Sequence, residues 1–299
     1  MELKNNKYRK ILFVVNPNAG DAGSYDLMGD IKHHFVDEQM VTRTMIMNKK
    51  DNDIWLKKHI NEFSPETVVA CGGDGTVNFV ADHILNRNIK LGIVPMGSYN
   101  GMAYQMGIPS DIREALKIIK HGQTRPVDAI RINSEYICLH LSDLGTNARV
   151  IKRYKADRFK GFKGYIIQYF KELSKTKKFR CDIKTEQNSI KAKVAMVIIA
   201  NAAYYGTGVT VNPEAELDDG LFEIILIKSY PFWFLFYVLI ALLRGSSGKE
   251  KWTNIIKCKH AEITVKPAQE LQVDGELAGS SVNISPEILS QQLEILSIT

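Results

Sequence analysis

The sequence predicts an α/β protein in which a parallel-sheet domain is followed by a β-rich domain. The run at residues 68–71 is short and uniformly apolar, which is typical of a parallel strand covered on both faces. The same strand-then-loop pattern occurs at residues 11–20 and 91–101, so three such units in the first 110 residues indicate a parallel sheet. After the first of these runs, apolar residues return on one face of a helix, at Val77, Val80, Ala81, Ile84 and Leu85.

Residues 72–76, Gly-Gly-Asp-Gly-Thr, join this strand to this helix. Glycines let backbone N–H groups approach an anion closely, and a helix N-terminus adds partial positive charge. Thr76 is placed where its hydroxyl would cap the helix, whereas Asp74 would need a metal ion or a donor between it and a bound phosphate. The spacing matches neither the dinucleotide fingerprint nor the P-loop, so an ordinary glycine turn is an equally good interpretation of this loop alone.

We expect the three loops to share one rim of the sheet, because the carboxyl ends of parallel strands lie along one edge and ligands bind just outside it. Asn16, Ser98 and Asn100 are the polar side chains best placed to contact a ligand there. All three loops carry glycine where a phosphate would lie, which favours a phosphate site over three unrelated turns.

The domain boundary is expected near residues 121–126, which gives domains at 1–125 and 126–299. The helix predicted at 112–120 ends at Gly122, and Pro126 forbids its continuation. The apolar tail at 295–298 is a candidate for a strand that returns to the first domain. Beyond the boundary the pattern changes to short β-rich segments separated by turn residues, at 130–132, 136–141, 193–200, 221–227, 261–265 and 270–273.

Length and composition are those of a two-domain soluble enzyme, with 299 residues, 45% apolar and 24% charged. The charged start of the chain, residues 1–10, has no apolar signal core, which argues against export. The cysteines lack C-x-x-C spacing and therefore indicate neither a zinc site nor a disulfide framework. We expect reduced thiols and a cytoplasmic location for a chain whose cysteines are Cys71, Cys138, Cys181 and Cys258.

Two segments suggest contact with a membrane surface. The aromatic and apolar run at residues 231–243 is too short to span a bilayer, which leaves a buried helix or a helix at the lipid interface. Residues 149–180 contain twelve Lys or Arg against two acidic residues, in a chain of net charge +6. This charge is either a solvated face or a peripheral contact with anionic headgroups. Nucleic acid is not expected as a partner, because no nucleic-acid-binding motif accompanies the charge.

Seven blocks occur in an order that resembles the diacylglycerol kinase catalytic-domain family, which includes bacterial lipid kinases and the sphingosine and ceramide kinases. The blocks start at Asn16-Pro17-Asn18-Ala19-Gly20, Gly72-Gly73-Asp74-Gly75-Thr76 and Pro95-Met96-Gly97-Ser98-Tyr99-Asn100, and continue at residues 201–208, 212–215, 217–221 and 274–276. The resemblance covers nearly the whole chain. NAD kinases and phosphofructokinases share only the Gly-Gly-Asp-Gly block, so the resemblance implies a related nucleotide domain followed by a sandwich-like lipid-substrate domain.

The resemblance also implies functions for particular residues. Glu276 would accept the proton of the lipid hydroxyl, and Asp274 and Asp74 would belong to the catalytic machinery. Without the resemblance, Asp274-Gly275 is best interpreted as a hairpin turn. A structural Mg²⁺ would be held by Asp219 with main-chain oxygens of Glu216 and Leu221. ATP would be bound by Asn16, Pro17, Asn18, Ala19, Gly20, Asn48, Gly72, Gly73, Asp74, Gly75, Thr76, Val77, Asn78 and Ser98.

Three positions depart from the family pattern. Gly101 stands where many bacterial relatives have aspartate, which removes one expected link in the charge network around Asp74. Asn48 and Ser98 each stand where relatives often have threonine. These departures concern the nucleotide contacts and the choice of lipid more than the phosphoryl-transfer chemistry.

The sequence therefore predicts an ATP- and Mg²⁺-dependent lipid kinase with diacylglycerol as leading substrate. Other lipid alcohols, such as a sphingoid base or phosphatidylglycerol, are close alternatives. An NAD kinase-like enzyme and a non-catalytic nucleotide- or lipid-binding regulator stay open as further alternatives. A homodimer is compatible with the sequence.

Overall fold

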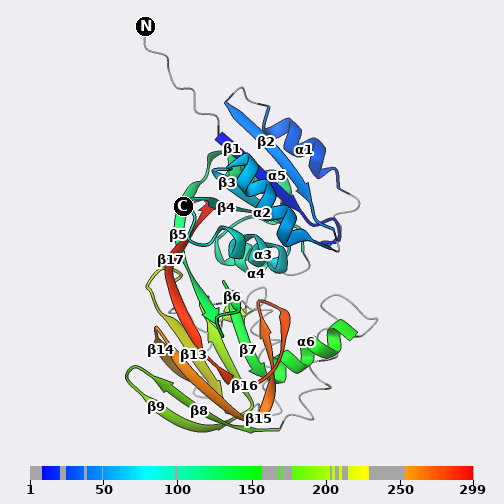
Figure 1. The fold of residues 1–299 in the computed structure, drawn as a ribbon. Coiled ribbons are helices and arrows are strands. Elements are labelled where there is room, and N and C mark those ends of the chain that lie inside the picture. The colour runs from blue at the N-terminus through cyan, green and yellow to red at the C-terminus, as the bar shows by residue number, and fades with distance from the viewer. Residues whose placement is uncertain are drawn as a thin grey trace. The chain divides into compact units, whose positions relative to one another are not determined.

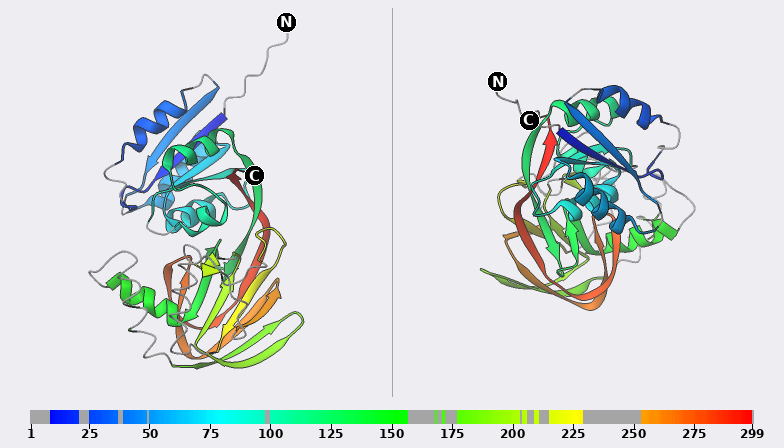
Figure 2. Two further views of the ribbon diagram at one scale, coloured as in Figure 1. Left: turned by 180° about the vertical axis from the view of Figure 1, so that it is seen from behind. Right: turned by 45° about the horizontal axis from the view of Figure 1, so that its top comes forward.

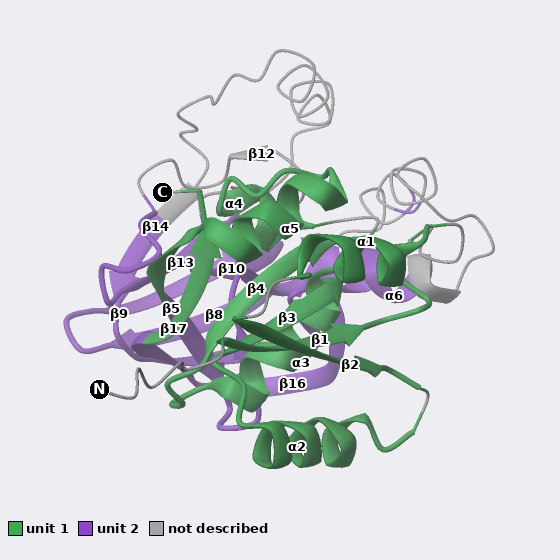
Figure 3. Cartoon of the chain, turned by 90° about the horizontal axis from the view of Figure 1, so that it is seen from above, with its two compact units in different colours: residues 1–127, 292–299 green, residues 128–291 purple. Residues whose placement is uncertain are grey.

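A computed structural model describes residues 9–20, 25–36, 39–48, 50–97, 100–156, 168, 171, 177–202, 204–205, 209–210, 215–228 and 253–298. The chain forms two compact units, coloured separately in Figure 3: unit 1 is Met1–Val127 with Gln292–Thr299, and unit 2 is Asp128–Gln291. The expected aromatic segment at 231–243 and most of the basic segment at 149–180 lie outside the described residues.

Unit 1 contains the predicted parallel sheet, whose neighbouring strands follow the order β2, β1, β3, β4 and β17 (Figure 1), and β5 and β6 continue the same sheet beyond β17. Every residue of β3 is buried, as expected for a strand covered on both faces. The predicted strand in the C-terminal tail is confirmed, because β17 pairs in parallel with β4 through Glu294 and Ile295. The strands are β1 (Arg9–Val15), β2 (Met40–Ile46), β3 (Thr67–Gly72), β4 (Lys90–Pro95) and β17 (Pro286–Ser297).

Helices cover the two faces of this sheet, with α1 beside α5 on one side and α2 beside α3 on the other (Figure 3). The predicted face of α3 is buried throughout, and α5 packs so closely on β4 that a Cβ at Gly92 would lie 2.5 Å from Ile119 Cδ1. The helices are α1 (Leu27–His34), α2 (Asn52–Phe63), α3 (Asp74–Ile84), α4 (Gly101–Gln105) and α5 (Ile112–His121).

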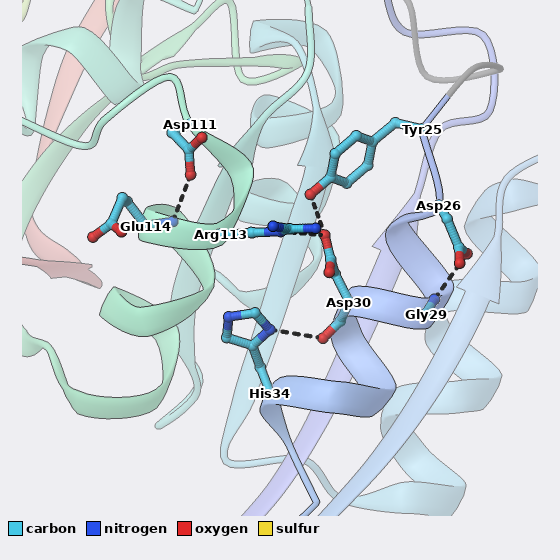
Figure 4. A network of polar contacts seen from close by, with 8 residues as sticks. All are labelled: Tyr25, Asp26, Gly29, Asp30, His34, Asp111, Arg113 and Glu114. Atoms are coloured by element: carbon cyan, nitrogen blue, oxygen red, sulfur yellow. Dashed lines mark hydrogen bonds and ion pairs between the residues drawn. The ribbon is translucent and has the colours of Figure 1, made fainter.

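A polar network joins α1 to α5 (Figure 4). The carboxylate of Asp30 accepts hydrogen bonds from Tyr25 Oη and from Arg113 Nε, the latter at 3.2 Å. Arg9 links β1 to the same helix α5, because its guanidinium donates to the carbonyls of Ile119 and Lys120 in the last turn of α5.

Unit 2 is built on an antiparallel sheet with the strand order β14, β13, β10, β7, β15, β8 and β9, and β16 pairs with β15. Side chains of one large apolar cluster, including Leu144, Phe179, Phe222 and Val273, fill its core together with Ile130 and Ile132 of β5. The strands are β5 (Gln123–Ile132), β6 (Tyr136–Cys138), β7 (Leu141–Gly145), β8 (Phe179–Thr185), β9 (Ser189–Val194), β10 (Met196–Ala200), β11 (Tyr204–Tyr205), β12 (Val209–Thr210), β13 (Phe222–Ile227), β14 (Thr253–Cys258), β15 (Ala261–Val273) and β16 (Glu276–Ile284), and α6 (Thr146–Ala156) follows β7.

Three predicted strand boundaries in unit 2 are wrong. The segment 136–141 divides into β6 and the start of β7, and 193–200 divides at Ala195 between β9 and β10. Conversely, 261–265 and 270–273 belong to one strand, β15. The pairing of β15 with β16 shifts register between Thr264 and Gln269, and Pro267 falls in this interval, where a missing N–H is tolerated.

Strands β5 and β17 carry the chain between the two units and lie side by side in Figures 1 and 2. None of the helices in the described part of the chain is long and apolar enough to span a membrane.

The four cysteines are free and buried, so we predict that they resist modification in the folded protein. Burial raises the pKa of each thiol, to about 12 for Cys181 and Cys258. At pH 8 the reactive thiolate is therefore scarce as well as inaccessible. Ellman's reagent should modify the native protein at least about a hundredfold more slowly than the protein in guanidinium, where four thiols should react. Rapid labelling of the native chain would contradict this arrangement.

Candidate functional site

The loops that follow β1, β3 and β4 converge at the carboxyl edge of the unit 1 sheet. Adjacent parallel pairing of the three strands brings their ends together, with Val15 opposite Cys71 and Gly72 opposite Pro95. The first and second loops are joined directly, since Asn16 Nδ2 donates to Thr76 Oγ1 at 3.2 Å. The predicted common rim is therefore present, and it is held by side chains as well as by the sheet.

Asp74 joins the second loop to the third. Its Oδ2 accepts from the N–H of Gly101 at 3.0 Å and its Oδ1 accepts from the N–H of Met102 at 3.1 Å. These donors are the first N–H groups of α4, which have no acceptor within the helix. Although position 101 lacks the expected acidic side chain, it is still linked to Asp74, because the backbone N–H of Gly101 donates to the Asp74 carboxylate.

Glycines allow the three loops to touch. A Cβ on Gly97 would lie 2.5 Å from Gly73 Cα, and a Cβ on Gly20 would lie 2.4 Å from Met96 O. Within the second loop, a Cβ on Gly72 would lie 2.3 Å from Thr76 Oγ1. Larger residues would separate the loops, so glycine is required here by packing.

The expectation that Thr76 caps α3 is wrong. The helix begins at Asp74 with Gly73 as its N-cap, and no side chain caps it. Thr76 is the third residue of the helix and is buried, and its hydroxyl accepts the hydrogen bond from Asn16. The N-terminus of α3 therefore offers backbone N–H groups from a loop of glycines.

The other residues expected to contact nucleotide differ in exposure. Pro17, Asn18 and Gly75 are exposed on the loops, whereas the side chains of Ala19 and Val77 are buried. Asn48 follows β2, the strand beside β1, and its amide oxygen accepts from the N–H of Lys50. Asn78 is half-buried on α3, and Ser98 lies outside the described residues.

In unit 2, the Asp274-Gly275 pair forms the two-residue turn between β15 and β16. Both residues have positive φ, 45° and 84°, and Val273 pairs with Glu276 on either side. These angles are those of a type I′ hairpin turn, for which Asp-Gly is favoured. The hairpin predicted from the dipeptide is confirmed.

The Asp274 carboxylate is bound by the chain between β6 and β7. It accepts hydrogen bonds from the backbone N–H groups of Leu139, His140 and Leu141 at 2.7 to 3.0 Å. Because these N–H groups bind a carboxylate, they do not donate to a neighbouring strand, and the segment 136–141 is therefore not one continuous strand. Asp274 has the contacts of an anchor for the turn, and Glu276, two residues later, is exposed at the start of β16.

A second acidic turn, residues 217–220, is organised by Asp128, which is not among the site residues predicted from the sequence. Asp128 is fully buried in β5 and accepts from the N–H groups of Gly220 at 2.7 Å and Gln291 at 2.6 Å. Burial raises the pKa of the Asp128 carboxyl, the charges of Asp219 and Asp218 raise it further, and the two hydrogen bonds oppose both effects. Asp128 lies just before the strand predicted at 130–132, and the signal that could have identified it is a lone acid among the apolar residues Val127, Ala129 and Ile130.

The residues expected to hold Mg²⁺ lie on this turn. Asp219 Oδ1 accepts from the N–H of Leu221 at 2.9 Å, and its Oδ2 lies 3.8 Å from Lys257 Nζ. Carboxylate and main-chain oxygens suit a hard divalent cation, and the crowding of Asp128, Asp218 and Asp219 favours added positive charge. In the described part of the chain, no group of three His, Cys, Asp or Glu side chains is arranged to hold a metal ion, so an ion here would depend on main-chain oxygens and water as well.

Comparison with known proteins assigns both units. Residues 10–132 match the diacylglycerol kinase catalytic domain, and residues 142–297 match the YegS C-terminal NAD kinase beta sandwich-like domain. A probable lipid kinase YegS-like of Klebsiella pneumoniae is 30% identical over 221 residues, 72% of each chain. A diacylglycerol kinase of Staphylococcus epidermidis is 27% identical over 219 residues, 72% of this chain and 69% of that one.

Solved structures agree on the fold. The crystal structure of a diacylglycerol kinase from Bacillus anthracis aligns with a TM-score of 0.71 at 20% identity and covers 97% of each chain. An NAD kinase from Archaeoglobus fulgidus aligns with a TM-score of 0.55 at 12% identity, over 96% of this chain and 94% of that one. The expected α/β architecture with a second, sandwich-like domain is confirmed.

We predict that Asp74→Asn destabilises unit 1, because an amide oxygen can replace only one carboxylate oxygen and the amide nitrogen would face an N–H donor of α4. The loss should be about 1 to 2 kcal/mol, measured by thermal or denaturant unfolding without nucleotide. Asp51→Asn is the matched control, since Asp51 precedes α2 without a side-chain capping bond. Equal effects of the two substitutions would show that Asp74 does not support α4.

Proposed function

Because the chain belongs to the diacylglycerol kinase catalytic-domain family and is a lipid kinase, we propose that it transfers the γ-phosphoryl group of ATP to a lipid hydroxyl. Diacylglycerol is the leading acceptor, and phosphatidic acid would be the product. The observation that carries this proposal is the set of three glycine-containing loops held together by Asn16 and Asp74.

The rim of unit 1 would bind the nucleotide. Phosphoryl transfer depends mainly on positioning the phosphates and offsetting their charge. Gly73 and Gly75 place backbone N–H groups at the start of α3 without side chains in the way. Asp74 would tolerate nearby phosphate because Gly101 and Met102 already donate to both of its oxygens.

In unit 2, Glu276 would accept the proton of the attacking hydroxyl. It is exposed, and it directly follows a turn whose first residue is held by three backbone N–H groups. Asp274 would therefore act as a positioning residue and would not itself exchange protons. A carboxylate needs such fixed placement to work as a general base.

Divalent cations would contribute to the reaction at two places. Mg²⁺ bound to ATP offsets charge on the migrating phosphoryl group. A second ion would be held by Asp219 with main-chain oxygens of Glu216 and Leu221, next to the turn that Asp128 organises. Within this arrangement Asp128 ties the turn to the Gln291 backbone through its two carboxylate oxygens.

A substrate panel tests the proposal. Labelled γ-phosphate from Mg-ATP is offered to diacylglycerol, a sphingoid base, ceramide and phosphatidylglycerol in mixed micelles, and to NAD in buffer. Label in diacylglycerol supports the proposal, and label in another lipid corrects the substrate. Label in NAD alone, or ATP binding without transfer to any of them, would overturn it.

We predict that Glu276→Gln lowers kcat at least about a hundredfold, because a positioned base contributes that much, while the KM for ATP changes little. Glu262→Gln is the matched control, since Glu262 is exposed on the adjacent strand β15. Retention of most of the wild-type kcat by Glu276→Gln would exclude Glu276 as the base.

We also propose that the chain works in the cytoplasm and contacts anionic membrane surfaces through its basic segment. Lys177 and Lys178 are exposed just before β8, whereas Lys152 of α6 is paired with Glu270 at 2.7 Å. Each basic residue near such a surface contributes about 1 kcal/mol.

Replacing Lys177 and Lys178 by Gln should therefore weaken binding to phosphatidylglycerol-containing vesicles about tenfold or more at low salt. The control replaces two exposed lysines of unit 1, Lys32 and Lys57, and carries the same change in net charge. Similar losses in both variants, measured by vesicle sedimentation, would mean that overall charge and not this segment is responsible.

A further inference from the structure

A buried chain of polar groups leads from the start of α6 to the turn before Glu276. Gln272 lies on β15 directly opposite Asp143 of β7, and its Nε2 donates to Asp143 Oδ2 at 2.6 Å. The other end of the same amide, Gln272 Oε1, accepts from the N–H of Gly275 at 2.7 Å. Asp143 is fully buried and Gln272 nearly so.

The carboxylate fixes the direction of this chain. Asp143 also accepts from Asn147 Nδ2 at 2.6 Å and from the N–H of Ala148 at 2.9 Å, both in the first turn of α6. Asp143 is the acceptor in each of these hydrogen bonds, so Gln272 presents its NH₂ group to Asp143. Its oxygen is then directed to Gly275, where a flipped amide would place one donor against another.

Gly275 is the point in the turn that needs this acceptor. In a two-residue turn the ladder resumes with the pair of Val273 and Glu276, so the N–H of Gly275 has no partner strand. Asp274 is fixed by the N–H groups of residues 139–141, and Gly275 is fixed by Gln272. The two residues before Glu276 are thus held from two separate elements.

We propose that Gln272, oriented by Asp143, is a positioning residue for Glu276. This inference rests on the proposed function, in which Glu276 accepts the lipid proton. The hydrogen bonds of Gln272 go to Asp143 and Gly275 and not to Glu276. It acts by restricting the turn, so that Glu276 leaves the hairpin in one direction, as general-base catalysis requires.

The first test measures the turn itself and needs no activity. Gln272→Met keeps the side-chain length but removes the acceptor, so amide hydrogen exchange at Gly275 should become at least about tenfold faster. Gln269→Met is the matched control, because Gln269 is buried on the same strand but bonds Arg149 and the carbonyls of Pro267 and Ala268. Equal exchange at Gly275 in both variants would overturn the proposal.

The second test measures catalysis. Gln272→Met should lower kcat about tenfold or more with the KM for ATP unchanged, at a temperature where the variant is fully folded. In a Glu276→Gln background the same substitution should cost no further kcat, because the two residues act as a unit. An equal loss in both backgrounds would indicate a general structural effect and would refute the positioning role.

Exchanging the two polar groups tests the direction of the hydrogen bonds. Asp143→Asn alone places an NH₂ group against the NH₂ group of Gln272 and should lower kcat as Gln272→Met does. Combining Asp143→Asn with Gln272→Glu places the carboxylate at position 272, where it can accept from position 143 and from Gly275, and should recover much of the lost kcat. No recovery of kcat in a folded double variant would contradict this direction of the hydrogen bonds.

The exchange measurement also separates this inference from the proposed function. A wild-type chain without transfer to any lipid would refute the proposed function, and amide exchange at Gly275 would still decide whether Gln272 holds the turn.

Discussion

Carboxylates bound to backbone N–H groups hold the loops on which the proposed function depends. Buried N–H groups outside helices and sheets need acceptors, and loops supply few of their own. Asp74 binds the start of α4, Asp128 binds Gly220 and Gln291, and Asp274 binds residues 139–141. Each acid joins segments that are distant in sequence, so the geometry of the loops depends on these three side chains.

Structural and catalytic interpretations of a motif are not alternatives in this protein. Asp274-Gly275 is an ordinary type I′ turn by its dihedral angles, and the same turn presents Glu276. Asp74 supports α4 and also stands at the N-terminus of α3, where phosphate would bind. A motif can therefore be required for folding at the same positions where it would serve the proposed chemistry.

Close approach of backbones is the second constraint on the rim. Gly97 and Gly73 approach to a distance that excludes any side chain, and Gly20 approaches Met96 in the same way. Polar links between Asn16 and Thr76 and from Asp74 to the third loop then hold these contacts. The resulting rim combines the N-terminus of α3 with loops joined by hydrogen bonds, which suits recognition of phosphate.

The sequence alone determined β1, β3, β4, α3 and α5 of unit 1, the tail strand and the Asp-Gly hairpin, because each follows from local periodicity or turn chemistry. It did not predict α1, β2, α2 or α4. It could also identify the three loops as neighbours, since parallel strands end at one edge. Only the tertiary structure showed that Thr76 binds Asn16 and does not cap α3, and that β15 continues through Pro267. It also showed Asp128 bonded to Gln291, 163 residues away. Such hydrogen bonds form because a side chain and an N–H group far apart in sequence lie close together in the folded chain, and local sequence patterns do not predict this proximity.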